Sequence, residues 1–123
     1  MKEIEDLANS VKTQLNLEYD DTSVMFIENF IEKNKQQIEK EEWDGLINSM
    51  GAFLGQCIIE NYGGKWEVDE ETQVTCVAFD NKNKVYPFAK VSKQFENGLE
   101  DSISSMYRLI PIVFKLSPKK EMD

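Results

Sequence analysis

The chain has 123 residues, of which 41% are hydrophobic and 30% are charged, and its formal net charge is −9 with no histidine. This length fits a single domain spanning residues 1–123, and the apolar content is too high for a disordered chain. Without histidine, Ser-His-Asp and Cys-His catalytic sites are excluded within the chain.

The charge is unevenly distributed along the sequence. Residues 1–71 contain 6 Lys/Arg and 17 Asp/Glu, which gives −11, whereas residues 72–123 contain 8 and 6, which gives +2. An acidic field repels nucleic-acid phosphates and anionic lipid, so we expect neither as a partner, whereas a basic protein would be attracted. The first residues lack a signal-peptide pattern and no apolar run is long enough to span a bilayer, so a cytoplasmic location is expected. The oligomeric state is left open.

Two helices are predicted in the N-terminal third. The first spans residues 2–15, and its apolar residues recur at helical spacing. They are Ile4, Leu7, Ala8, Val11 and Leu15. The second spans residues 23–33, with Asp21 or Thr22 as its N-cap. Its expected core stripe is Val24, Ile27 and Ile31, with Phe26 and Phe30 beside it.

A central helix is predicted from Trp43 to Tyr62, after a polar connection over residues 34–40, and we expect it to be enclosed by other elements. Most of its circumference is apolar, which is typical of a buried helix. Only a narrow polar strip, formed by Ser49, Gln56 and Glu60, interrupts this pattern. Gly51 and Gly55 each disfavour a helix interior by about 1 kcal/mol relative to Ala, so we expect a neighbouring element to approach them closely.

The period changes after Gly63-Gly64, where three short strands are predicted. They cover residues 65–68, 73–79 and 84–86, with Trp66 and Val68 on one side of the first strand. Such close neighbours in sequence most simply form an antiparallel meander.

Two helices should close the fold. One begins at Pro87 and ends at Asn97-Gly98, and the other runs from Leu99 or Asp101 to about Ile110, where Pro111 limits or kinks it. The expected buried side of the last helix is Ile103, Met106, Tyr107 and Ile110. Residues 117–123 are expected to be a loose tail. The fold class is therefore α+β, with N-terminal helices around the central helix, a three-stranded antiparallel meander and two C-terminal helices.

No catalytic constellation, metal-ligand set or cofactor motif is recognisable in the sequence. The acidic run Asp69-Glu70-Glu71 lacks the ligand spacing and central glycine of a calcium loop. Cys57 and Cys76 lie within apolar elements without a neighbouring cation, so we expect buried, unreactive thiols.

Three sets of residues are candidate binding sites. The first is an acidic face for a basic protein partner, formed by Glu28, Glu32, Glu41, Glu42 and Asp44. The second is a ligand cleft between the central helix and the sheet, formed by Gln56, Glu60, Trp66 and Tyr86. The third is a positive patch for an acidic partner, formed by Lys82, Lys84, Tyr86, Phe88, Lys90 and Lys93. In each case the alternative is that these side chains are merely the solvated or packed sides of their elements.

Two segments, GAFLGQCIIENYGGKW at residues 51–66 and YPFAKVSKQFENGLEDSISSMY at residues 86–107, carry a family resemblance. They resemble a family of small bacterial domains of unknown function, associated with immunity proteins of polymorphic toxin systems. The resemblance implies a non-enzymatic protein that binds another protein, such as a toxin, and it transfers no catalytic residue. A small-ligand-binding or enzymatic domain is the alternative.

Overall fold

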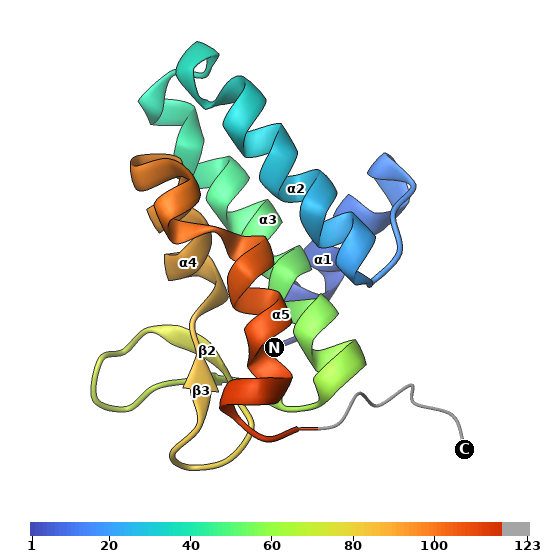
Figure 1. Cartoon of the computed structure of the whole chain (residues 1–123), viewed down its shortest axis with the longest axis vertical. Coiled ribbons are helices and arrows are strands. Elements are labelled where there is room, and N and C mark those ends of the chain that lie inside the picture. The colour runs from blue at the N-terminus through green and yellow to red at the C-terminus, as the bar shows by residue number, and fades with distance from the viewer. Residues whose placement is uncertain (117–123) are drawn as a thin grey trace.

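The computed structural model describes residues 1–116, so the expected tail at residues 117–123 lies outside the described residues. The fold contains five α-helices, two short 3-10 helices and a three-stranded sheet. In chain order they are α1 (Lys2–Leu15), α2 (Asp21–Asn34), η1 (Lys35–Gln37), α3 (Lys40–Tyr62), β1 (Lys65–Val68), β2 (Thr75–Ala78), β3 (Lys84–Val85), α4 (Pro87–Asn97), η2 (Gly98–Asp101) and α5 (Ile103–Val113). The sheet lies at one end of the helical layer (Figure 1). The predicted α+β class is confirmed.

α1 has the predicted bounds, whereas α2 spans Asp21–Asn34, longer than the predicted residues 23–33. α1 ends at Leu15, and Asn16 follows in the left-handed conformation that commonly ends a helix. The N-cap of α2 is Asp20, not Asp21 or Thr22, because the Asp20 carboxylate accepts a hydrogen bond from the Ser23 amide at 2.9 Å. Phe26, which was expected beside the core stripe, is exposed.

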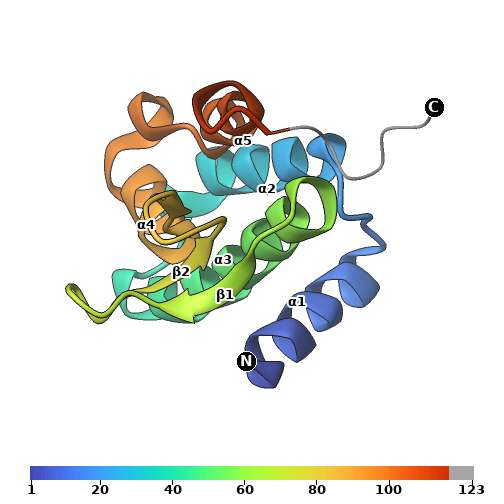
Figure 2. The same ribbon diagram turned by 90° about the horizontal axis from the view of Figure 1, so that it is seen from below.

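Helix α3 is the core helix of the fold. It lies between α1 on one side and α2 and α5 on the other (Figure 2). Its interior from Met50 to Gly55 is buried without interruption, followed by Cys57 and Ile58. Phe53 is fully buried and forms an aromatic contact with Tyr19 at 5.3 Å between ring centroids, although the sequence pattern did not place it on the core side.

Both predicted close approaches to α3 are present. A Cβ on Gly51 would overlap the ring of Phe88 and lie 3.0 Å from the Phe88 Cα, and a Cβ on Gly55 would overlap the ring of Trp66. The Trp66 and Phe88 rings contact each other at 5.6 Å between centroids. The glycines therefore let β1 and α4 pack directly on the α3 backbone.

The three strands form the predicted antiparallel meander in the order β1-β2-β3. Of the two residues predicted on one side of β1, Trp66 is buried and Val68 is exposed. β2 is shorter than predicted and begins at Thr75, because residues 69–74 form a turn. In this turn the Asp69 amide donates to the Val74 carbonyl, and Gln73 has a φ of 61°.

The C-terminal helices differ from the prediction at the start and at the end of α5. α4 spans Pro87–Asn97 as expected, but Gly98–Asp101 form the separate 3-10 helix η2, so α5 begins only at Ile103. Ser102 is its N-cap and accepts a hydrogen bond from the Ser105 amide at 3.0 Å. α5 continues through Pro111 to Val113, one turn beyond the expected end.

Candidate functional site

Helix α5 has two apolar faces, and the part of the chain that the structure describes covers only one of them. Ile103, Tyr107 and Ile110 are buried against the rest of the fold. Further round the helix, Leu109, Ile112 and Val113 are exposed at 49%, 71% and 62%. A helix that is apolar all round is normally enclosed, so an uncovered apolar face on a small domain indicates a surface that another molecule covers.

Two open hollows lie near this helix, and Leu109 and Val113 of the uncovered face line the first of them. The first has a volume of about 420 Å³ and lies between α4, η2 and α5. Its apolar lining is formed by Val85, Leu99, Met106, Leu109, Ile110, Val113 and Phe114. The second has a volume of about 370 Å³ and is bordered by the 69–74 turn, β3 and α4. Its apolar lining is formed by Val74, Val85, Ala89 and Met106.

The two hollows form one continuous surface, because Val85, Lys90 and Met106 line both of them. We call this surface the α4–α5 groove. Its lining is mainly apolar, and Lys90 lines both hollows. The polar lining residues are Glu100, Ser102 and Ser105 in the first hollow and Thr72, Tyr86 and Lys93 in the second. Met side chains adapt their shape to what packs on them, so Met106 can follow the contour of a bound partner.

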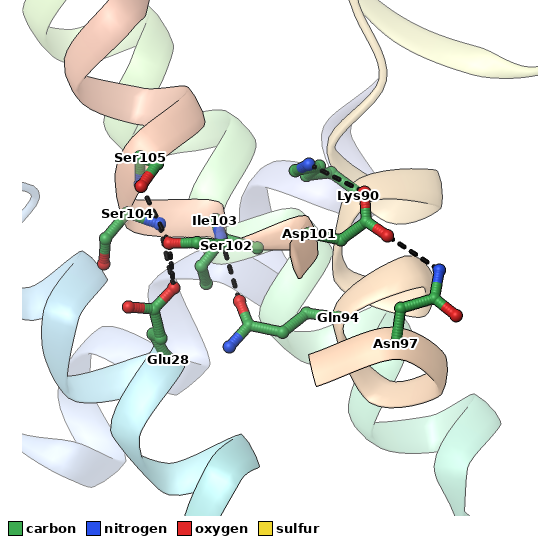
Figure 3. Close-up of polar contacts among 9 residues, drawn as sticks. All are labelled: Glu28, Lys90, Gln94, Asn97, Asp101, Ser102, Ile103, Ser104 and Ser105. Carbon is green, nitrogen blue, oxygen red and sulfur yellow. Dashed lines mark hydrogen bonds and ion pairs between the residues drawn. The ribbon is translucent and has the colours of Figure 1, made fainter. Parts of the chain in front are cut away.

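The α4 side of the groove carries two lysines, Lys90 and Lys93. The Lys90 ammonium pairs with the Asp101 carboxylate at 3.3 Å, and the other oxygen of Asp101 accepts from the Asn97 amide at 2.7 Å (Figure 3). The hydrogen bond from Asn97 and the pairing with Lys90 hold the pKa of Asp101 below its usual value. Lys93 lines the second hollow and is exposed.

The start of α5 is fixed by residues of α2 and α4. The Glu28 carboxylate accepts hydrogen bonds from the Ser102 hydroxyl at 2.5 Å and from the Ser104 amide at 3.2 Å. Gln94 is fully buried, and its side-chain carbonyl accepts from the Ile103 amide at 2.8 Å (Figure 3). These bonds satisfy amides that a helix N-terminus leaves without partners, so the α5 wall of the groove is firmly positioned.

The outer edge of the second hollow is held by Tyr86. Its hydroxyl donates to the Asp69 carboxylate, which also accepts from the Glu71 amide at 2.9 Å. The hydrogen bond from Tyr86 is the main reason why the pKa of Asp69 is lowered, and the same bond raises the pKa of Tyr86 to about 12. The turn that contributes Thr72 and Val74 to the groove is therefore tied to the start of α4.

A model of the family described as Domain of unknown function (DUF3806) matches residues 24–107, which is more than half of the chain. The chain belongs to this family. Among curated proteins and solved structures, none matches the chain. The matched part of this DUF3806 domain runs from α2 to the middle of α5, so it includes the second hollow entirely. Leu109 and Val113 lie beyond it.

The five acidic residues predicted as a binding face fall into two groups in this DUF3806 domain. Glu41, Glu42 and Asp44 are exposed in the first turns of α3. Glu28 and Glu32 lie on α2 and bond within the domain. Glu28 holds the start of α5, as described above, and Glu32 pairs with Lys35 at 3.2 Å and accepts from Gln94 at 3.0 Å. The first group is available to a partner, and the second group has a structural role.

The predicted ligand-cleft residues are only partly brought together. The Trp66 indole donates to the Gln56 side-chain carbonyl at 3.1 Å, and the Gln56 amide donates to Glu60 at 3.2 Å. These three residues form one hydrogen-bonded chain along the polar strip of α3. Tyr86 instead lies at the second hollow, bonded to Asp69. The α4–α5 groove was not predicted from the sequence, although the apolar residues beyond Ile110 indicated a further contact surface.

The positive patch is also divided. Phe88 packs on Gly51 and Trp66, as the alternative interpretation expected, whereas Tyr86, Lys90 and Lys93 line the groove.

The chemistry of the other candidate groups is limited. Within residues 1–116, no group of three or more Cys, Asp or Glu residues is arranged to hold a metal ion. Cys57 and Cys76 are buried thiols, and burial raises the pKa of Cys76, which disfavours the reactive thiolate. None of the helices between residues 1 and 116 has the length and apolar character needed to cross a bilayer. The groove is therefore the strongest candidate for a functional surface.

Proposed function

We propose that this DUF3806 domain binds another protein through the α4–α5 groove and acts without catalysis. The observation that carries the proposal is the uncovered apolar face of α5 beside two adjoining hollows. Large exposed apolar surface on a small domain marks an interaction site, because leaving it in water is unfavourable by about 25 cal/mol per Å².

The form of the groove favours a protein over a small molecule. Each hollow has a volume within the range of small-ligand sites, but such sites enclose most of the ligand surface. Here the lining includes Leu109 and Val113, which are themselves 49% and 62% exposed. A ligand confined to one hollow would leave these side chains uncovered, whereas a partner protein covers the hollows and the exposed face of α5 together.

Binding of a toxin by an immunity protein belongs to this class of activity, and the resemblance of residues 51–66 and 86–107 supports it as one form of the proposal. The matched family has no assigned activity. We therefore define the partner by the chemistry of the surface that it would cover.

A capture experiment with a matched control tests the proposal. Leu109→Asp places a charge on the groove, and Phe26→Asp places one on an equally exposed apolar residue of α2, since the exposures are 49% and 45%. Partners captured from lysate by the unmodified domain are identified, purified and titrated against all three proteins. We expect the affinity to fall with Leu109→Asp and to be retained with Phe26→Asp. Equal affinity for all three proteins would refute the groove as the binding surface.

A further inference from the structure

We infer that the segment that docks in the α4–α5 groove is acidic and amphipathic, with apolar side chains in the two hollows and a carboxylate on Lys93. This inference rests on the proposed function, because it names the chemistry of the partner for the same surface.

The apolar part of the inference follows from the continuity of the groove. The hollows share Val85, Lys90 and Met106, so one segment can fill both of them without leaving the surface. An amphipathic helix meets this requirement, because its apolar side chains recur at three- and four-residue spacing along one face. Helix-in-groove docking uses such side chains as anchors in adjacent pockets.

The acidic part follows from how the two lysines are paired. Lys90 already has the Asp101 carboxylate as its partner at 3.3 Å. Lys93, one turn further along α4, forms no close ion pair within residues 1–116. It interacts with Asp101 at longer range, and Lys90 already pairs with that carboxylate. Lys93 also borders the apolar second hollow and is exposed. Among residues 1–116, no acidic side chain lines the second hollow, whereas Glu100 lines the first. A carboxylate from a partner is therefore the complementary charge at this position.

The surrounding sequence reinforces this local charge. Residues 81–95 contain four lysines and no acidic residue, in a chain whose net charge is −9. An acidic partner would be repelled by the net charge of −9 and attracted at the lysines of β3 and α4. Charge thus directs the partner to the groove and disfavours other orientations, which is the usual contribution of charge complementarity to binding.

The test uses two synthetic amphipathic peptides of about 15 residues, long enough for about four helical turns. Both have the same Leu positions at helical spacing, and their polar faces carry either Glu or Lys. Each is labelled with fluorescein, and binding to the full chain is measured by fluorescence anisotropy. We expect the Glu peptide to bind more tightly than the Lys peptide. Lys93→Gln should weaken binding of the Glu peptide about two- to fivefold, as expected for one exposed ion pair.

Two controls separate this inference from the proposed function. Lys33→Gln removes an exposed lysine on α2, outside the groove lining. It should change the affinity for neither the Glu peptide nor the Lys peptide. Leu109→Asp should greatly weaken binding of the Glu peptide. If Leu109→Asp abolishes binding but both peptides bind equally and Lys93→Gln has no effect, the acidic inference is refuted and the groove stands. If Leu109→Asp has no effect, or neither peptide binds, the groove is refuted as well.

A second copy of the chain is the other occupant to be tested. Size-exclusion chromatography with light scattering of the unmodified chain and of Leu109→Asp distinguishes this case. A dimer that Leu109→Asp converts to a monomer would show that the groove is occupied by the chain itself, and would overturn the inference.

Discussion

The ring of Trp66 lies directly against the backbone of Gly55, so closely that a Cβ on residue 55 would overlap the ring carbons. This contact joins β1 to the middle of α3. The Trp66 indole is oriented by its hydrogen bond to Gln56, one residue further along the same helix. Gly55 is therefore required by packing, which explains a glycine in a buried helix that would otherwise favour Ala.

Larger side chains at Gly55 should destabilise the domain. Gly55→Leu should lower the free energy of unfolding by about 1 to 3 kcal/mol through overpacking, in spite of the better helix propensity of Leu. Gly45→Ala is the matched control in the same helix, because nothing lies within 4 Å of a Cβ at that position. It should stabilise the domain by up to about 1 kcal/mol. Urea denaturation measures the free energy of unfolding of both variants. An increase in stability for Gly55→Leu would contradict the packing role of Gly55.

The helices and the sheet could be predicted because their signals are local. The apolar spacing in α1 and α4 and the Gly63-Gly64 stop give these elements nearly the bounds that the structure has. The failures lie where a local signal competes with a distant contact. Trp66 and Val68 alternate alike in β1, and this alternation does not show that Trp66 packs on Gly55 of α3 and is buried whereas Val68 is exposed.

Removal of the Glu28 carboxylate should release the start of α5. Glu28→Ala leaves the Ser104 amide without its acceptor and the Ser102 hydroxyl without its partner, so we expect a loss of about 1.5 to 3 kcal/mol in the free energy of unfolding. Asp44→Ala, on the exposed side of α3, should change stability by no more than about 0.5 kcal/mol. Equal effects of the two substitutions in thermal or urea unfolding would contradict a specific role for Glu28.

A double-mutant cycle refines this prediction. If Glu28 and Ser102 act together, the combined Glu28→Ala and Ser102→Ala variant should lose less stability than the sum of the single variants. Additive losses would mean that Ser102 acts only as the N-cap of α5, through its bond to the Ser105 amide.

The bond between Tyr86 and Asp69 should give a defined pH dependence. The pKa of Asp69 is below its usual 3.8, so its contribution to stability is present above pH 3.8 and is lost as pH falls through the lowered value. The pKa of Tyr86 is raised from 10.0 to about 12, so its contribution is present below pH 10 and is lost as pH rises toward 12. The stability difference between the unmodified chain and Tyr86→Phe should therefore be largest between pH 4 and 10. A difference that does not depend on pH would contradict this assignment.

The candidate site was harder to predict than the fold. The sequence pattern assigned Ile103, Met106, Tyr107 and Ile110 to the buried side of the last helix, and the structure leaves Met106 partly exposed in the groove. Apolar residues continue to Phe114, all around the helix, and this continuation indicates a second contact surface. The role of Glu28 had no local signal, because its partners are 74 and 76 residues away in the sequence.

The acidic face at the start of α3 remains a separate prediction. Reversal of Glu41, Glu42 and Asp44 to Lys should leave thermal stability nearly unchanged, because these side chains are exposed. If they attract a basic partner, the reversal should slow its association at low salt, and raising the ionic strength should remove the difference. Glu28 and Glu32 are left unchanged in this variant because they bond within the domain. Identical association rates at low salt would refute the acidic face.

Methyl NMR spectroscopy tests the central claim, docking in the α4–α5 groove, most directly. In methyl-labelled full-length chain, titration with the Glu peptide should shift the methyl signals of Val74, Val85, Met106, Leu109 and Val113, which line the groove. The methyl signals of Ile27 and Ile31, buried in α2, should stay in place. Shifts concentrated at the groove would support the account. Binding that leaves the groove methyls unmoved and shifts signals elsewhere on the domain would contradict it.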